Sequence, residues 1–295
     1  YLLALFLQND ILAKAMNYTL LCGILLGMGL FARHVLQNQQ FSIISMLIFV
    51  SIPSVFAISH TAYNDLFVTF FTLAALYSFF RWSEHRLAAW LILCGIFSGS
   101  AAACKYTALL ATPLGLLGIL WMANRNGNST QETLRRLALY AAAAMIAGSP
   151  FYLKNWIVTG NPFYPFFYGI FGGRGWDGDQ ARLFDFITQS FGMGRSFLDY
   201  LLLPWNLSLR AKMDSLTFDG ILGPIFLLTL PFLAALRRWE TPLRMILIYA
   251  LLTFFFWAST AQQIRYLIPI FPLLAIVVGA ILTRYQSRKK IFGLL

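Results

Sequence analysis

Charged residues are scarce in this sequence. Only 11% of its 295 residues are Asp, Glu, Lys or Arg, whereas 59% are hydrophobic and the mean hydropathy is +0.69. A water-soluble globule of this length needs more polar surface than such a composition supplies. The shortage excludes an ordinary soluble enzyme and indicates an all-α, polytopic transmembrane helical bundle.

Cysteine is also rare, and its three residues, Cys22, Cys94 and Cys104, all lie in apolar runs. Their spacing fits neither a metal-ligand set nor a disulfide framework, so we interpret them as small buried side chains. Asp177 and Asp179 in "WDGD" form only a weak metal signal, because no further acids stand near them. The sequence therefore predicts no metal site, and it leaves open whether a divalent metal serves as a cofactor.

Acidic residues are half as frequent as basic ones, which gives a net charge of +11. The basic residues stand in short clusters between apolar runs, a pattern typical of cytoplasmic loops and not of a nucleic-acid partner. Most of the 22 Lys and Arg fall in five connecting or terminal segments. These are "ARHVLQNQQ", "RWSEHR", "NRNGNSTQETLRR", "RRWETPLR" and "TRYQSRKK". We predict that these segments face the cytoplasm and that the alternate loops face outward.

Nine apolar runs approach the ~20 residues that cross a bilayer. They are residues 16–35, 41–58, 64–80, 87–103, 107–123, 137–153, 220–236, 243–260 and 266–283. They predict three parts: a transmembrane module at 1–153, an outer-face loop at 154–219, and C-terminal helices with a basic tail at 220–295. The start, "YLLALFLQND", has no initiator Met and no basic region of a signal peptide, so we interpret the chain as an N-terminally truncated fragment.

The segment 154–219 differs from a polar loop. Its first part, "KNWIVTGNPFYPFFYGIFGGRGW", combines aromatics, Pro and Gly, as a kinked structure at headgroup level would. Its second part, "DQARLFDFITQSFGMGRSFLDYLLLPW", mixes acids and apolar residues at helical spacing. That pattern favours an interfacial amphipathic helix.

Several polar residues fall at the predicted outer ends of the helices. Asp65 opens an apolar helix, where it either caps the helix N-terminus or takes part in catalysis or ligand binding. His60 and Tyr63 add hydrogen-bonding groups just before it, although a lone interfacial His is often only solvated. Lys105 interrupts a run of small residues, and it either reaches for water or binds an anion.

Arg265 begins the last apolar helix, directly before Tyr266. A guanidinium opposes the dipole at a helix N-terminus, so its presence there favours an anionic ligand. Asn155 ends another helix on the same face, where it is either a stop signal or a pocket residue. Together these side chains would suit the anionic headgroup of a lipid, with a carboxylate placed to accept a proton.

Four segments in this order resemble the GT-C glycosyltransferases. They are "AYNDLFVTFFTLAALYSFFRW", "WLILCGIFSGSAAACKYTALLATP", "SPFYLKNWIVTGNPFYPFFYG" and "IRYLIPIFPLLAIVVG". They are most similar to the branch of protein O-mannosyltransferases and lipid A aminoarabinose transferases. The resemblance covers nearly the whole chain.

The resemblance implies an integral membrane glycosyltransferase of the bacterial inner membrane with its site on the periplasmic face. Its donor would be a polyprenyl-phosphate-linked sugar, and its acceptor a glycan, lipid or protein. Asp65 would be the family's second acidic residue at the active site, and the main catalytic acid would lie upstream of Tyr1. Lys105 and Arg265 would contact the donor phosphate, and Asn155 would shape the pocket.

Two other classes stay open at this point. A transporter or flippase of lipid-linked sugars would also need cations for the phosphate, but it predicts polar positions near the bilayer midplane. A non-catalytic membrane scaffold would need neither cations for a phosphate nor polar positions near the midplane. The sequence does not fix the sugar, the acceptor or the oligomeric state.

Overall fold

The computed structural model describes residues 8–37, 40–235 and 239–291, and within these ranges it contains helices and loops but no strand. The chain forms two compact units, residues 1–73 with 192–295 and residues 74–191. The first unit joins segments far apart in sequence, so its bounds differ from the three consecutive parts predicted above, which stay a prediction. Each unit is described by itself.

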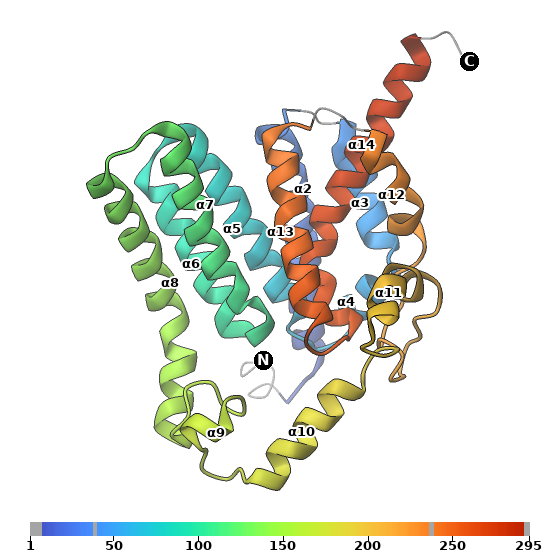
Figure 1. Cartoon of the computed structure of the whole chain (residues 1–295). Coiled ribbons are helices and arrows are strands. Elements are labelled where there is room, and N and C mark those ends of the chain that lie inside the picture. Colours follow the sequence, from blue (N-terminus) through green and yellow to red (C-terminus); the bar gives the residue numbers. More distant parts are fainter. Residues whose placement is uncertain (1–7, 38–39, 236–238, 292–295) are drawn as a thin grey trace. The chain divides into compact units, whose positions relative to one another are not determined.

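The first unit is built around α14, whose apolar residues are buried on all sides. Leu273, Ala275 and Ile276 have no exposed surface, as expected for a helix that is hydrophobic all round. Figure 1 shows the helices of this unit. They are α2 (Ile11–His34), α3 (Gln40–Ser51), α4 (Pro53–Ser59), the start of α5 (Asp65–His85), α11 (Phe197–Leu209), α12 (Ile225–Ala235), α13 (Thr241–Ala258), the 3-10 helix η2 (Ile264–Ile270) and α14 (Phe271–Ile291).

One predicted crossing of this unit is broken. The run 41–58 folds as α3 and α4, which bend by 77° at Ile52. Ile52 has extended backbone, with φ −70° and ψ 119°, and Pro53 opens α4. Proline disfavours helical backbone at the residue before it and lacks an N–H, which suits the first position of a new helix. The sequence therefore explains the break, which we did not predict.

The second unit consists of the rest of α5, α6 (Ala88–Cys104), η1 (Tyr106–Leu110), α7 (Ala111–Asn126), α8 (Thr130–Thr159), α9 (Tyr168–Phe171) and α10 (Gly178–Ser190). Helices α6 and α8 pack backbone to backbone at Gly95 and Gly99. A Cβ added at Gly99 would lie 2.1 Å from the carbonyl oxygen of Ala144, and one at Gly95 would lie 2.5 Å from that of Tyr140. Glycines four apart allow this approach between membrane helices.

All nine predicted runs lie on helices, but the structure does not support nine crossings. By length and composition, six helical segments of the described residues could span a membrane, or seven if the bent pair counts as one span. They are Ile11–His34, Asp65–His85, Tyr106–Asn126, Thr130–Thr159, Thr241–Ala258 and Ile264–Arg284. Helices α6 and α12, with 17 and 11 residues, are shorter than these. The prediction of an all-helical chain with several helices that could cross a membrane is confirmed.

The segment 154–219 carries α9, α10 and α11. No residue of α10 is buried, and Phe186 is 72% exposed. Helix α11 buries Leu203 and Leu207 but exposes Phe197, Leu201 and other apolar residues on its opposite face. The interfacial position of these helices stays a prediction. The predicted helix is interrupted, however, between α10 and α11.

The break before α11 is fixed by a charged contact. The guanidinium of Arg195 donates hydrogen bonds to the carbonyls of Ala258 and Thr260, both at 2.7 Å. These carbonyls lie at the C-terminus of α13, which favours a cation. Ser196 then caps α11, so the interfacial helix starts at the end of a candidate span.

Candidate functional site

The loop before α5 is held by a buried amide. Asn17 lies inside α2 with no exposed surface, and its Nδ2 donates to the carbonyls of Thr61 and, at 2.9 Å, Tyr63. A polar side chain inside a membrane helix is costly unless it has such partners. Asn17 thereby fixes the backbone that leads to Asp65.

Asp65 is the first residue of α5 and only 1% exposed. Its carbonyl accepts a hydrogen bond from the Thr69 hydroxyl at 2.7 Å, and the first helical turn continues from Asn64, whose carbonyl accepts from Val68 N–H at 3.2 Å. The carboxylate therefore lies at the positive end of the helix dipole, as predicted. A residue that only caps a helix can stay exposed, so capping alone does not explain why Asp65 is buried.

Arg265 is held between two aromatic rings, within electrostatic range of Asp65. Its Cζ lies 5.1 Å from the ring centres of both Tyr63 and Tyr266, and it interacts electrostatically with Asp65. The guanidinium also donates to the Gln263 side chain and to the Tyr266 hydroxyl, both at 3.3 Å. Stacking on aromatic faces leaves a guanidinium rigid and half-buried.

The loop 212–222 contacts the residues next to Arg265. Asp219 accepts a hydrogen bond from Gln263 Nε2 at 3.4 Å, and Ile264 N–H donates to the Phe218 carbonyl at 2.7 Å. Gly220 is needed there, because a Cβ would lie 2.7 Å from Ile264 and 2.8 Å from the Ser54 hydroxyl. The loop therefore fixes Gln263, which in turn orients Arg265.

His60 lies at the C-terminus of α4, where the loop before α5 begins. Its Nδ1 is 2.7 Å from the Phe56 carbonyl, which can only accept, so Nδ1 carries the proton in that contact. Nε2 is then free to accept from the Tyr18 hydroxyl at 3.5 Å. The ring packs edge-on to Tyr18 and is exposed, so His60 is not part of the buried group.

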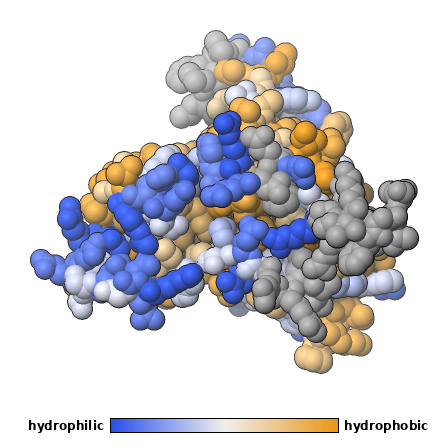
Figure 2. Space-filling model, turned by 90° about the horizontal axis from the view of Figure 1, so that it is seen from above, coloured by the Kyte–Doolittle hydropathy of each residue, from blue (hydrophilic) through white to orange (hydrophobic). Residues whose placement is uncertain are grey.

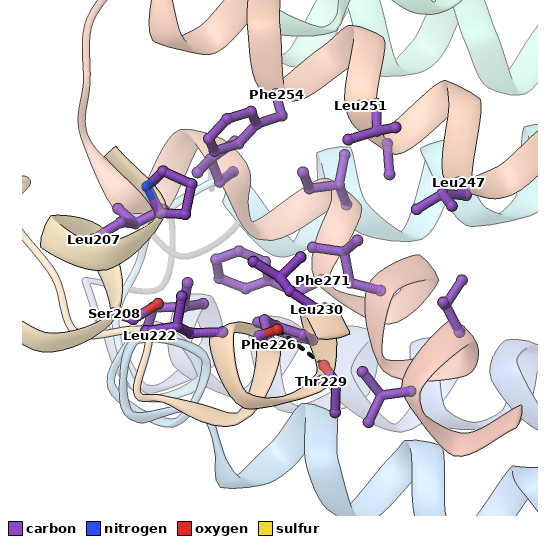
Figure 3. Close-up of a pocket in the computed structure, with 18 of the residues that line it drawn as sticks. Leu207, Ser208, Leu222, Phe226, Thr229, Leu230, Leu247, Leu251, Phe254 and Phe271 are labelled. Carbon is purple, nitrogen blue, oxygen red and sulfur yellow. Dashed lines mark hydrogen bonds between the residues drawn. The ribbon is translucent and has the colours of Figure 1, made fainter. Parts of the chain in front are cut away.

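An apolar cavity of about 170 Å³ lies in the same unit among α11, α12, α13 and α14 (Figure 3). Its lining includes Leu267, which follows Arg265 by two residues in the sequence, together with Ile270 and Phe271. Of the two hydroxyls in its wall, that of Thr229 donates back to its own helix at 2.9 and 3.0 Å. Such a lining suits a hydrocarbon chain, since apolar cavities take small hydrocarbons.

Lys105 and Asn155 belong to the second unit. Lys105 ends α6 with extended backbone and is half-exposed. Asn155 is buried, and its Nδ2 donates to the Tyr106 hydroxyl at 3.0 Å, which donates to the Tyr164 carbonyl at 2.7 Å. Our interpretation of Asn155 as a helix stop was wrong. Helix α8 continues to Thr159 and ends before Gly160, whose φ is +80°.

The other acidic signals have structural roles. Asp177 caps α10 by accepting from Gln180 N–H at 2.8 Å, and Asp179 pairs with Arg182 at 2.6 Å. Within the described ranges, no group of three or more His, Cys, Asp or Glu side chains is arranged to hold a metal ion.

The structure thus brings together four of the seven predicted residues, Tyr63, Asp65, Arg265 and Tyr266, with His60 at the edge. It also assigns supporting roles to residues that sequence reasoning missed: Asn17, Asp219 and Gln263. Asn17 carried a usable signal, because an amide inside an apolar run points to a bound partner. Nothing in the sequence pairs Asp219 with Gln263.

Residues 3–272 match a family model described as a domain of unknown function (DUF8201). No curated protein and no solved structure gives a significant match to the chain.

Proposed function

The chain belongs to the DUF8201 family, a domain of unknown function, and from its site we propose that it is an integral membrane glycosyltransferase. Its donor would be a polyprenyl-phosphate-linked sugar, and its acceptor a glycan, lipid or protein. The reaction would take place at the outer, extracytoplasmic face of the bacterial inner membrane. The likeness to GT-C enzymes noted above supports the same reading.

One observation carries the proposal. A half-buried guanidinium, Arg265, is fixed over two tyrosine rings and lies within electrostatic range of a buried carboxylate, Asp65, and both residues stand at the ends of candidate spans. A cation held in a water-poor place suits a phosphate, and a neighbouring carboxylate suits a hydroxyl that must lose a proton. The apolar cavity that Leu267 helps to line would take part of the lipid tail.

The mechanism we propose is a single displacement at the anomeric carbon. The acceptor oxygen forms the new bond as the bond from the anomeric carbon to the phosphate oxygen breaks. Asp65 orients the acceptor hydroxyl and takes its proton, while Arg265 stabilises the charge that grows on the leaving phosphate. Lys105 stays a predicted second phosphate contact from the other unit, and Asn155 a predicted pocket residue.

The test is transfer of radiolabelled hexose or pentose from polyprenyl phosphate by the full-length protein in lipid nanodiscs. Arg265→Gln should lower kcat by about 100-fold, since one fixed charge at a developing anion contributes on the order of 3 kcal/mol. Asp65→Asn should lower kcat similarly. Donor binding should weaken less than catalysis does.

Matched controls come from the same unit. Arg210→Gln removes an exposed guanidinium at the end of α11, and Asp10→Asn removes an exposed carboxylate that pairs with Lys14. Both should keep full transfer. Undiminished transfer in the Arg265 and Asp65 variants would refute the mechanism. Lipid movement without any transfer by the wild type would instead favour a flippase.

A further inference from the structure

A second charged group lies in the second unit, away from the residues used above. We call it the Trp82 cluster: Trp82 and Arg86 at the end of α5, and Glu132 and Arg136 at the start of α8. These positions are at the ends of the candidate spans Asp65–His85 and Thr130–Thr159. Figure 2 looks onto the end of the helices where hydrophilic side chains gather, with hydrophobic ones at its margins.

Two guanidiniums converge on one buried indole. Trp82 is 1% exposed, and the Cζ atoms of Arg86 and Arg136 each lie 5.5 Å from its ring centre. Only Arg136 has an acidic partner, Glu132, with which it forms an i,i+4 ion pair. The cluster therefore holds two cations and one carboxylate around a single aromatic ring.

Arg86 is left with unused donors. Among the described residues, no protein acceptor takes a hydrogen bond from its guanidinium, and the residue is exposed. Partial burial and the neighbouring Arg136 lower the pKa of Arg86, whereas Glu132 raises it.

The backbone of Arg86 is also unusual. Its φ of +59° is that of the left-handed conformation, which ends many helices. Its N–H donates a hydrogen bond to the Trp82 carbonyl at 2.8 Å. Glycine is the usual residue at such a position, because a side chain there is strained. A strained arginine where glycine would suffice indicates a use for its side chain.

From this geometry we infer that the Trp82 cluster binds the phosphate of an anionic phospholipid headgroup. Arg86 would donate to the phosphate, and Arg136 would complete its charge neutralisation. Exposed Leu87 and Leu134 flank the cluster, at 58% and 60% exposure, and would contact the acyl chains. Basic pockets at the ends of transmembrane helices bind anionic headgroups in this way.

A simpler arrangement occurs nearby and provides the control. Arg125 lies over Trp121 at 5.3 Å, at the end of α7 in the same unit. It is a single cation on a 42% exposed indole, as expected for an interfacial anchor. Its removal changes surface charge as much as removal of Arg86 does, without touching the cluster.

The experiment measures the melting temperature of the full chain in nanodiscs of phosphatidylcholine, with and without phosphatidylglycerol. A third sample of phosphatidylcholine with inorganic phosphate separates a lipid headgroup from free phosphate. We expect phosphatidylglycerol to raise the wild-type melting temperature by about 5 °C, because a ligand of the folded state alone stabilises it. Phosphate alone should give no gain.

The variants make the inference specific. Arg86→Gly suits the backbone, so it should melt no lower than wild type in phosphatidylcholine and yet lose most of the phosphatidylglycerol gain. Arg86→Gln should lose the gain as well, Arg125→Gln should keep it, and Glu132→Gln should enlarge it. An unchanged gain in both Arg86 variants, an equal loss in Arg125→Gln, or a full gain with phosphate alone would overturn the inference.

Discussion

The contact between α6 and α8 gives a sharp stability prediction. In Gly99→Ala, the new Cβ would lie 2.1 Å from the Ala144 carbonyl oxygen and 2.8 Å from its carbonyl carbon. A carbon and an oxygen normally stay about 3.3–3.6 Å apart, so the helices must separate by about 1 Å. Because a Cβ has a fixed position on its backbone and the atoms it meets are backbone atoms of Ala144, no side-chain rotation can relieve the contact.

The expected cost follows from that separation. A gap of about 0.5–1 Å forfeits a quarter to a half of each contact energy, and overpacking of this kind costs about 1–3 kcal/mol. We expect the melting temperature to fall by several degrees, at about 2–4 °C for each kcal/mol. Gly148→Ala is the matched control in the same helix pair, because its Cβ would meet the Gly99 carbonyl oxygen at an ordinary 3.4 Å.

The assay uses the cysteines of the chain. A fluorogenic thiol dye reports unfolding when it reaches Cys94, which is buried, and Cys104, which is half-buried, both on α6. Cys22 is exposed and would label before unfolding, so the measurements use a Cys22→Ser background. If Gly99→Ala and Gly148→Ala melt at the same temperature, the close packing described here is incorrect.

Three further predictions concern other parts of the chain. Asn17→Ala removes two donations to the loop before Asp65, each worth about 1 kcal/mol, and transfer kinetics should show a fall in kcat larger than the change in KM. Tyr140→Phe removes the 2.9 Å hydrogen bond to the Ser98 hydroxyl and should destabilise the chain by about 1 kcal/mol, whereas Tyr200→Phe, at an exposed position, should not. Hydrogen bonds from Ser196 lower the pKa of Asp199, so this carboxylate stabilises the fold above the usual Asp pKa and the gain disappears as the pH falls through the lowered value. Thermal unfolding of wild type and Asp199→Asn should therefore differ at neutral pH and converge in acid, and a constant difference would contradict the assignment.

The sequence predicted the helices well because hydrophobicity over about 20 residues is a strong signal. It predicted the start of α5 at Asp65 for the same reason, since the carboxylate stands where the apolar run begins. It missed the end of α8, because the sequence around Asn155 resembles a turn although the helix continues to Thr159. Length alone also could not show that the run 41–58 bends at Pro53.

The candidate site was predictable in its residue types but not in its contacts. Arg265 stood out because it opposes a helix dipole, and the structure places aromatic rings against it. The supports of the site come from loops about 45 residues away in sequence, such as Asp219 for Gln263. Pairing of that kind depends on tertiary packing, which leaves no periodic trace in a single sequence.

The apolar cavity among α11, α12, α13 and α14 bears on how the protein is handled after extraction. Detergent tails that fit the cavity would replace the hydrocarbon lost with the bilayer, so detergents with the same head and tails of different length should preserve the fold to different degrees.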